Sequence, residues 1–126
     1  GVVINISSVQ AFVSQRIVAA YTTAKTAILG LTRSIAVDFA PHIRCVAVCP
    51  GTIDTPMLRE SFALSPNPDE VLRECIDMHP AGRIGVPEDV GELVLFLCSD
   101  KASFITGQAI RVDGGLGITI GGSKRD

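Results

Sequence analysis

The sequence predicts an α/β fold in which a parallel sheet is covered by helices on both faces. Two segments, 1–7 and 43–49, are apolar at nearly every position, which is typical of parallel strands buried on both sides. Strand and helix signals also alternate along the chain, and this order requires crossover connections between parallel strands. With 126 residues, the chain amounts to one domain or less.

A long helix is predicted over 19–40, because Pro41 ends the run. Apolar residues recur within it at helical spacing, so we expect them to face the sheet. The residues of this predicted stripe are Ala24, Ala27, Ile28, Leu31, Ile35 and Phe39. Pro50-Gly51 then ends the second strand.

The region from Thr55 to His79 contains several prolines and is predicted to be irregular, with a helix near 69–78. A further helix is predicted from Pro87 to about Ser99 and a third strand over 109–112. This helix is expected to turn four apolar residues inward: Val90, Leu93, Val94 and Leu97. Because three strands form a poor sheet by themselves, residues 1–115 are interpreted as half of a fold. The glycine-rich segment 116–126 is interpreted as a tail or an interface segment.

The composition excludes some classes of function. The formal net charge is −2 and the pI is about 5.6, so we expect no nucleic-acid surface; the one basic pair is Lys124-Arg125. No apolar run approaches the roughly 18 residues of a membrane span, and no leader pattern opens the chain; a cytoplasmic location is expected. Hydrophobic residues make up 47% of the chain, so we expect part of the surface to be covered by other protein.

The four cysteines do not have the spacing of a metal site. Cys45 and Cys49 would share one face of a strand about 13 Å apart, which is too far for a disulfide. We expect all four to be small buried side chains in a reducing compartment. His42 and His79 also lack ligand spacing, so no metal is expected.

Tyr21 and Lys25 stand four residues apart on the predicted long helix, and Ser8 lies thirteen residues before the tyrosine. This spacing puts the phenol and the ammonium on one helix face, one turn apart. A free tyrosine is a poor base at neutral pH, but a neighbouring ammonium favours its phenolate. Tyr21 could then exchange a proton with an alcohol or carbonyl whose oxygen Ser8 also binds. The spacing alone fits an ordinary surface pair equally well.

Further motifs surround this trio and decide between the two interpretations. Asn5-Ile6-Ser7-Ser8 and Pro50-Gly51-Thr52-Ile53-Asp54-Thr55 each close a strand, which is where open α/β sheets bind ligands. Downstream follow Gly82-Arg83-Ile84-Gly85, Pro87-Glu88-Asp89 and Val112-Asp113-Gly114-Gly115. In this order, the motifs from Val2 to Gly115 resemble the second half of the short-chain dehydrogenase/reductase family.

The resemblance implies a Rossmann-like, doubly wound sheet, of which this chain holds the second half. It also implies an NAD- or NADP-dependent oxidoreductase that interconverts a secondary alcohol and a ketone or aldehyde. By resemblance, Tyr21 is the general acid/base, Ser8 orients the substrate, and Lys25 assists the tyrosine and binds the nicotinamide ribose. Ser7 is the rival for the serine role. The asparagine that the family also uses lies upstream of this strand, so Asn5 is not its counterpart.

The same resemblance assigns cofactor contacts to the segment after the second strand. The cofactor-binding residues would be Tyr21, Lys25, Pro50, Gly51, Ile53 and Thr55. Ile53 would use its backbone and Thr55 its side chain, and both would hold the nicotinamide carboxamide. Gly115-Leu116-Gly117 and Gly121 imitate a dinucleotide-binding pattern, but we interpret them as a turn, because no βαβ unit follows. By the same resemblance, the residues that select NAD or NADP would lie in the first half of the fold. The sequence of this chain therefore does not predict which of the two cofactors is used.

Three expectations concern substrate and assembly. The segment Met57–His79 should form a lid over a small substrate such as a hydroxy acid or sugar, and Gln15 and Arg16 are candidates to reach it. The family resemblance implies a homo-oligomer, a tetramer, built through the long helix and the last strand. The alternative is that the chain is a non-catalytic half-domain that serves as an assembly or structural module.

Overall fold

A computed structural model describes residues 1–121, and the Lys124-Arg125 pair lies outside this range. Three parallel strands form one sheet in the order β1 (Val2–Ile6), β2 (Arg44–Pro50) and β3 (Ala109–Val112). In the register of this sheet, Ile6 lies opposite Val48, and Pro50 lies opposite Val112. The predicted α/β class with adjacent parallel strands is confirmed.

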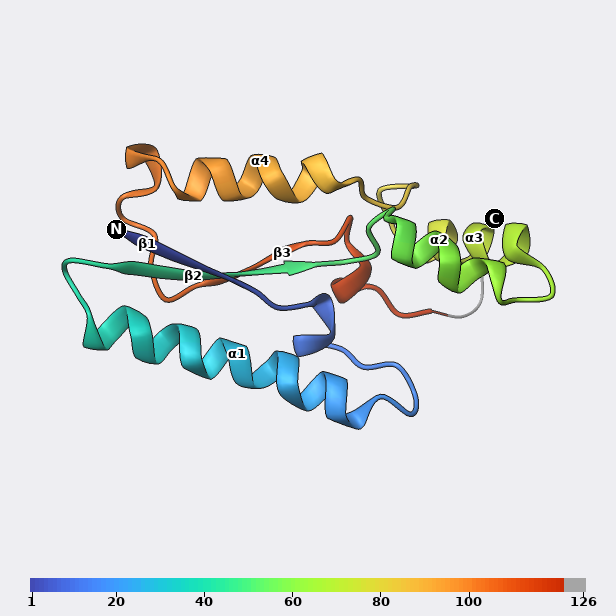
Figure 1. Ribbon diagram of the computed structural model, residues 1–126, viewed down its shortest axis with the longest axis horizontal. Helices are drawn as coiled ribbons and strands as arrows, with labels where there is room; N and C mark the ends of the chain where they lie inside the picture. Colours follow the sequence, from blue (N-terminus) through green and yellow to red (C-terminus); the bar gives the residue numbers. More distant parts are fainter. Residues whose placement is uncertain (122–126) are drawn as a thin grey trace.

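Two helices cover opposite faces of the sheet, as a doubly wound fold requires. Helix α1 (Ala19–Asp38) lies on one face and α4 (Pro87–Leu97) on the other (Figure 1). The central strand β2 is therefore buried on both sides, and its five residues 45–49 are fully inaccessible to solvent. The predicted inward side of α4 is confirmed, since Leu97 is buried and Val90, Leu93 and Val94 pack against the same core.

Arg44, at the start of β2, ties the sheet to the end of α4. Its guanidinium donates to the carbonyls of Leu97 at 2.8 Å and Ser99 at 3.4 Å, and also to the carbonyl of Ile105 at 3.3 Å. A cation is favourable at this place, because the last carbonyls of a helix carry partial negative charge. The contact fixes α4 against the sheet at the edge opposite the strands' carboxyl ends.

The buried face of α1 differs from the predicted stripe. Leu29, Thr32 and Ala36 are buried, whereas Leu31 and Phe39 are about half exposed. Thr32 is buried because its hydroxyl accepts from Asn5 Nδ2 at 3.0 Å and donates to the Ile28 carbonyl. The prediction was wrong because α1 carries apolar residues on more than one face, and a polar residue lies in its contact with the sheet.

The segment after β2 is more helical than predicted. Helices α2 (Pro56–Ala63) and α3 (Pro68–Met78) pack on each other and project beyond the carboxyl ends of the strands (Figure 1). The prediction of an irregular segment was wrong for α2. Thr55 caps this helix by accepting from the Leu58 N–H at 3.2 Å, and Pro56 occupies the first turn, where proline is tolerated.

Short 3-10 helices complete the described chain: η1 (Val9–Ala11), η2 (Asp100–Ala102) and η3 (Leu116–Ile118). Within the segment that was interpreted as a tail, η3 is anchored, since the Asp113 carboxylate accepts from the N–H groups of Gly115 and Gly117. The Gly117 N–H is thus occupied, and a Cβ there would lie 2.8 Å from Asp113 Oδ2. Both observations fit a turn rather than a phosphate loop.

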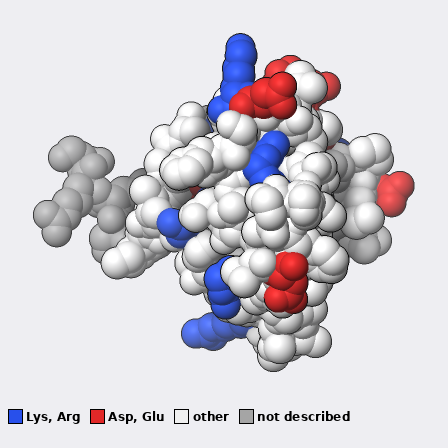
Figure 2. All heavy atoms as spheres, turned by 90° about the vertical axis from the view of Figure 1, so that its left-hand side faces the viewer, with Lys and Arg blue, Asp and Glu red and all other residues white. Residues whose placement is uncertain are grey.

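The surface carries acidic and basic side chains in mixture. On the face that Figure 2 shows, Lys and Arg as well as Asp and Glu are scattered singly or in small groups among a larger area of other residues. Within residues 1–121, no helix is long and apolar enough to cross a membrane. Cys45 and Cys49 are buried and Cys75 is partly buried, but Cys98 is exposed, so the expectation of four buried cysteines was wrong for Cys98.

Candidate active site

A cavity of about 730 Å³ opens at the carboxyl ends of the strands. Parallel strands place the loops that follow them at one edge of the sheet, where ligand sites of such folds occur. Ser8, Tyr21 and Gly51 all line this cavity, so the structure brings together residues from the two predicted motifs. Further residues on its wall come from η1 and the loop after it, from the end of α3 and the residues that follow it, and from the segment after β3; among them are Val9, Gln10, Met78, Pro80, Leu116 and Ile120.

Ser8 is buried and is the N-cap residue of η1, shortly after the end of β1. Its hydroxyl oxygen accepts a hydrogen bond from the Gln10 N–H at 3.1 Å, as an N-cap residue does. A hydroxyl that accepts one hydrogen bond still has its own proton to donate. Ser8 is therefore held in place on the cavity wall and retains its own proton as a donor.

Tyr21 and Lys25 lie one turn apart on α1, as the spacing predicts. The Lys25 Nζ lies 5.5 Å from the centroid of the Tyr21 ring, within the range of a cation–π contact. Tyr21 is about half exposed and borders the cavity, whereas Lys25 is partly buried beside it. The phenol can thus reach a ligand while the ammonium stays close to the ring.

Ser7, the rival for the serine role, lies elsewhere. It is 4% exposed, and its hydroxyl donates to the Lys25 carbonyl at 2.7 Å. Ser7 therefore connects the end of β1 to the helix turn that carries Tyr21 and Lys25. Asn5, two residues earlier, is likewise engaged with α1 through Thr32.

The segment Pro50–Thr55, hereafter the β2 loop, contributes Gly51 and Thr52 to the wall of the same cavity. The Gly51 N–H donates to the Val112 carbonyl at 3.1 Å. A Cβ at Gly51 would lie 2.9 Å from the Asp113 Cα and 3.0 Å from its Cβ. Because real Cβ contacts essentially never come this close, Gly51 is required for the close approach of the β2 loop to the end of β3.

Ile53 forms a parallel bridge with Gly85. The two hydrogen bonds of the bridge run from the Gly85 N–H to the Thr52 carbonyl and from the Asp54 N–H to the Gly85 carbonyl, both at 2.8 Å. They involve the residues on either side of Ile53. Within residues 1–121, no hydrogen bond uses the N–H or the C=O of Ile53. A carboxamide group has both an N–H donor and a C=O acceptor, so it can bind to the C=O and the N–H of one residue.

The far end of the β2 loop is fixed by charge. Asp54 pairs with Arg59 on α2 through two hydrogen bonds of 2.7 and 2.8 Å, and the Arg59 side chain lowers the pKa of the Asp54 carboxyl below its ordinary value. Thr55 keeps its hydroxyl proton, since its oxygen accepts from Leu58. Pro50, Ile53 and Thr55 lie beside the 730 Å³ cavity rather than on its wall.

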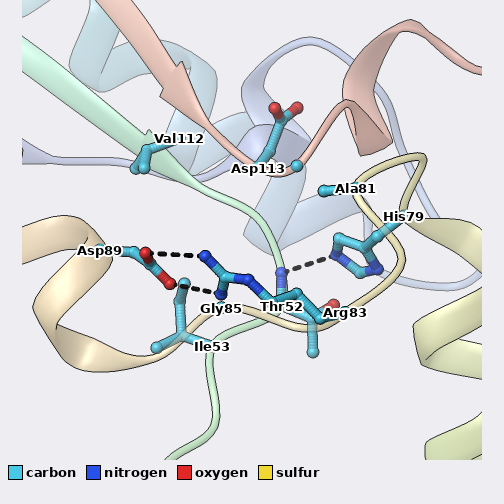
Figure 3. A pocket seen from close by; sticks show the side chains of 10 residues that line it. Thr52, Ile53, His79, Ala81, Arg83, Gly85, Asp89, Val112 and Asp113 are labelled. Atoms are coloured by element: carbon cyan, nitrogen blue, oxygen red, sulfur yellow. Dashed lines mark hydrogen bonds and ion pairs between the residues drawn. The ribbon is translucent and has the colours of Figure 1, made fainter.

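A smaller cavity, of about 140 Å³, lies on the other side of the β2 loop (Figure 3). Arg83 and Asp89 form an ion pair on its wall with hydrogen bonds of 2.7 and 3.0 Å. Asp89 also accepts from the Val86 N–H, which caps α4. The Arg83 guanidinium and this backbone bond lower the Asp89 pKa to about 2.

Two of the expected substrate contacts are placed differently by the structure. Gln15 lines the large cavity and accepts from Gln10 Nε2 at 3.1 Å, whereas Arg16 is exposed and is not on the cavity wall. Of the expected lid, only the end of α3 lines the cavity, through Asp77 and Met78. Leu116 and Ile120 were not predicted as site residues, and nothing in the sequence around them signals it.

The sequence and the structure of this chain are both similar to those of known proteins. The family model described as enoyl-(acyl carrier protein) reductase matches residues 1–117. A bullfrog protein (Aquarana catesbeiana), dehydrogenase/reductase SDR family member 6, is 42% identical over 119 residues. This chain belongs to the short-chain dehydrogenase/reductase family. The resemblance found in the motifs is thus confirmed, and the family consists of oxidoreductases.

Two further relatives show the breadth of the family. The 2-(S)-hydroxypropyl-CoM dehydrogenase 3 of Xanthobacter autotrophicus is 42% identical over 117 residues. The solved structure of ligand-free aldohexose dehydrogenase from Thermoplasma acidophilum is 46% identical, with a TM-score of 0.92.

The chain spans about half the length of these relatives. It covers 48% of the bullfrog protein, 46% of the Xanthobacter protein and 51% of the Thermoplasma chain. In turn, these matches include 91%, 92% and 99% of this chain. The three strands described here therefore correspond to one half of a Rossmann fold.

Proposed function

We propose that this chain provides the catalytic half of an NAD- or NADP-dependent oxidoreductase that interconverts a secondary alcohol and a ketone or aldehyde. One observation carries the proposal: the Ser8 hydroxyl and the Tyr21 phenol share one cavity wall with Gly51 and Thr52, and Lys25 lies 5.5 Å from the Tyr21 ring. In the proposed roles, these residues would supply a proton donor, a proton acceptor and a ligand-binding loop around one volume.

In this mechanism, Tyr21 takes the proton from the substrate hydroxyl during oxidation and returns it to the carbonyl oxygen during reduction. Ser8 donates its free hydroxyl proton to the same oxygen and so orients the substrate. The Lys25 ammonium stabilises negative charge on the phenol oxygen through its position beside the ring. A nicotinamide held by Lys25 and the β2 loop would supply the hydride chemistry: removal of hydride from the carbinol carbon in oxidation and its return to the carbonyl carbon in reduction.

The residues of the β2 loop fit a nicotinamide. Gly51 permits the close approach of backbone, and the N–H and C=O of Ile53 have no partner within the described residues. We propose that Ile53 binds the carboxamide through these two groups, that the Thr55 hydroxyl donates to it, and that Lys25 binds the ribose. Pro50 ends β2 and directs the loop toward the cavity.

The substrate class is proposed as a small polar alcohol such as a sugar or hydroxy acid. The names of two relatives, an aldohexose dehydrogenase and a hydroxypropyl-CoM dehydrogenase, support a hydroxylated substrate. The cavity wall combines the hydroxyl and amide groups of Ser8, Gln10 and Gln15 with the apolar side chains of Met78 and Leu116.

The test uses the protein in which this chain occurs. It is incubated with NAD⁺ or NADP⁺ and a panel of sugars, hydroxy acids and simple secondary alcohols, while the absorbance of the reduced nicotinamide is recorded. Reduction of one cofactor by at least one alcohol supports the proposal. Absence of turnover together with absence of cofactor binding in calorimetry contradicts it and favours a non-catalytic assembly module.

We also propose that the protein forms a homo-oligomer, a tetramer, through α1 and the region of β3. Leu31, Val37 and Phe39 on and just after α1 are between 53% and 76% exposed, and contact with a second copy would cover this apolar surface. Light scattering at micromolar concentration is the test. A stable monomer would contradict this part of the proposal.

A further inference from the structure

His79 stands directly after α3 and is 3% exposed. Both of its ring nitrogens are engaged. Nδ1 lies 2.6 Å from the Cys75 carbonyl oxygen, in the last turn of α3. Nε2 accepts from the Thr52 N–H at 3.3 Å (Figure 3). The imidazole therefore spans the end of one helix and the backbone of the β2 loop.

The two contacts select one form of the ring. A carbonyl oxygen can only accept, so Nδ1 must carry a proton, whereas an N–H can only donate, so Nε2 must be unprotonated. These requirements are met together by the neutral Nδ1–H tautomer. The opposite tautomer would place two acceptors against each other at Cys75 and two donors at Thr52. The imidazolium would retain the Cys75 contact but oppose two donors at Thr52.

Surrounding contacts hold the ring in this position. The residues that follow it form a turn in which the Gly82 N–H donates to the His79 carbonyl, and the Ala81 N–H donates to the Gly114 carbonyl at 2.9 Å. A Cβ at Gly114 would lie 3.6 Å from the His79 Cδ2, so the segment after β3 closes directly over the imidazole. Three charged side chains border the same small cavity, and each has a partner of its own: Arg83 and Asp89 pair with each other, and Asp113 accepts from two backbone N–H groups.

We propose that His79 is a positioning residue for the cofactor loop. By binding the Thr52 N–H, it fixes the β2 loop, and with it Ile53, at a set distance from the end of α3. Because Asp77 and Met78 at that helix end line the large cavity, His79 links the substrate side of the site to its nicotinamide side. This role rests on the proposed function, in which the β2 loop holds the nicotinamide.

A first experiment reads the tautomer in the unaltered protein. With ¹⁵N-labelled histidine at near-neutral pH, the NMR shifts of the His79 ring nitrogens should show a protonated Nδ1 and a bare Nε2. A ring protonated on Nε2 would overturn the proposal, because it could not accept from Thr52. This measurement needs no substitution and no cofactor.

A second experiment compares two variants that separate the two contacts. The side-chain amide of His79→Asn occupies the place of Nδ1 and can donate to Cys75 but cannot reach Thr52. The longer side chain of His79→Gln places an amide oxygen near the position of Nε2. Both put an amide in a buried site, so each controls for the general cost of the substitution.

We expect His79→Asn to speed hydrogen exchange at the Thr52 amide and to raise the cofactor KM by about three- to tenfold, the loss of one hydrogen bond, with little change in kcat. His79→Gln should restore most of both values. Equal Thr52 exchange in the two variants would overturn the proposal. If neither NAD nor NADP binds, the proposed function fails, but Thr52 exchange and the tautomer still decide the role of His79.

Discussion

Ser8, Tyr21 and Lys25 all come from the first 25 residues of the chain, whereas the β2 loop is held by His79, Gly85 and Val112, which lie in three distant segments. On the first side, which carries Ser8, Tyr21 and Lys25, one strand, one short turn and one helix determine the relative positions of these three residues. Ser7 and Asn5 then join that strand to the helix. On the second side, the backbone groups of Gly51, Thr52 and Asp54 are all anchored by long-range contacts.

This difference between the two sides follows their proposed roles: the first side is proposed to carry the proton transfer, and the second side to bind the cofactor. The residues that are proposed to move protons lie close together in the sequence, on one strand end, one turn and one helix that pack on β2. The loop that is proposed to bind the nicotinamide depends on the packing of α3, β3 and the Gly85 turn. We therefore expect substitutions on the first side to reduce kcat, and substitutions around the loop to reduce cofactor affinity and stability together.

The largest expected effect belongs to Tyr21→Phe, which removes one hydroxyl from an otherwise similar side chain. In the protein that contains this chain, kcat should fall on the order of a hundred- to ten-thousandfold, the usual contribution of general acid–base catalysis, with cofactor affinity nearly unchanged. Tyr21 is the only tyrosine and the chain has no tryptophan, so no signal from these residues can report on the folding of the variant. Its folding is therefore measured by far-UV circular dichroism. Near-native turnover would remove Tyr21 from the proposed mechanism.

Gly51→Ala tests the second side. The new Cβ would meet the backbone of Asp113, which cannot rotate away, so we expect a loss of roughly 1–3 kcal/mol in the free energy of unfolding, as for other overpacked sites. Cofactor affinity should fall as well. The matched control is Gly91→Ala on α4, where nothing lies within 4 Å of the added methyl; helix propensity predicts a gain there of up to about 1 kcal/mol. Urea unfolding of both variants measures the difference, and equal stabilities would contradict the prediction.

Ser7→Ala tests the connection between β1 and α1. It removes the hydrogen bond to the Lys25 carbonyl, and we expect a loss of about 1 kcal/mol in the free energy of unfolding. The control Ser34→Ala removes an exposed hydroxyl from the same helix and should change stability by less than about 0.5 kcal/mol. If the two variants are equally stable in urea, the Ser7 contact does not hold α1 in place.

The smallest effect concerns Asp89 and appears only in acid. Its pKa in the folded protein is about 2, below the roughly 3.9 of an unfolded aspartate. A lowered pKa stabilises the fold above the unfolded value, and this contribution disappears as the pH falls from about 4 toward 2. Asp89→Asn should therefore flatten the pH dependence of unfolding in that window. Glu88→Gln is the control, since Glu88 has no ion pair within residues 1–121; if it flattens the curve equally, Asp89 is not the cause.

The elements near the catalytic trio could be predicted well from the sequence, because their signals are local. The apolar runs predicted β1 and β2, and the four-residue spacing predicted that Lys25 lies beside Tyr21. Helix α2 was missed because three prolines between positions 56 and 68 indicate an irregular chain. The signal for it was present in Thr55-Pro56, an N-cap residue followed by a proline in the first turn.

Other features could not be predicted, because they depend on long-range packing. The buried side of α1 is decided by the Asn5–Thr32 hydrogen bond, which no periodicity of apolar residues reveals. The position of His79 against Thr52 likewise requires the end of α3 and the β2 loop to meet in space. A single histidine before a proline carries no sign of that contact.

β1 pairs with β2 along one edge, and no strand within residues 1–121 occupies its other edge. An unpaired edge is a template for another strand, and Ile6 at its end is 48% exposed. Produced as these residues alone, the polypeptide should therefore aggregate through edge-to-edge pairing. Co-expressed with a separate polypeptide that supplies a neighbouring parallel strand, it should instead stay in solution, because the added strand pairs with the open edge of β1.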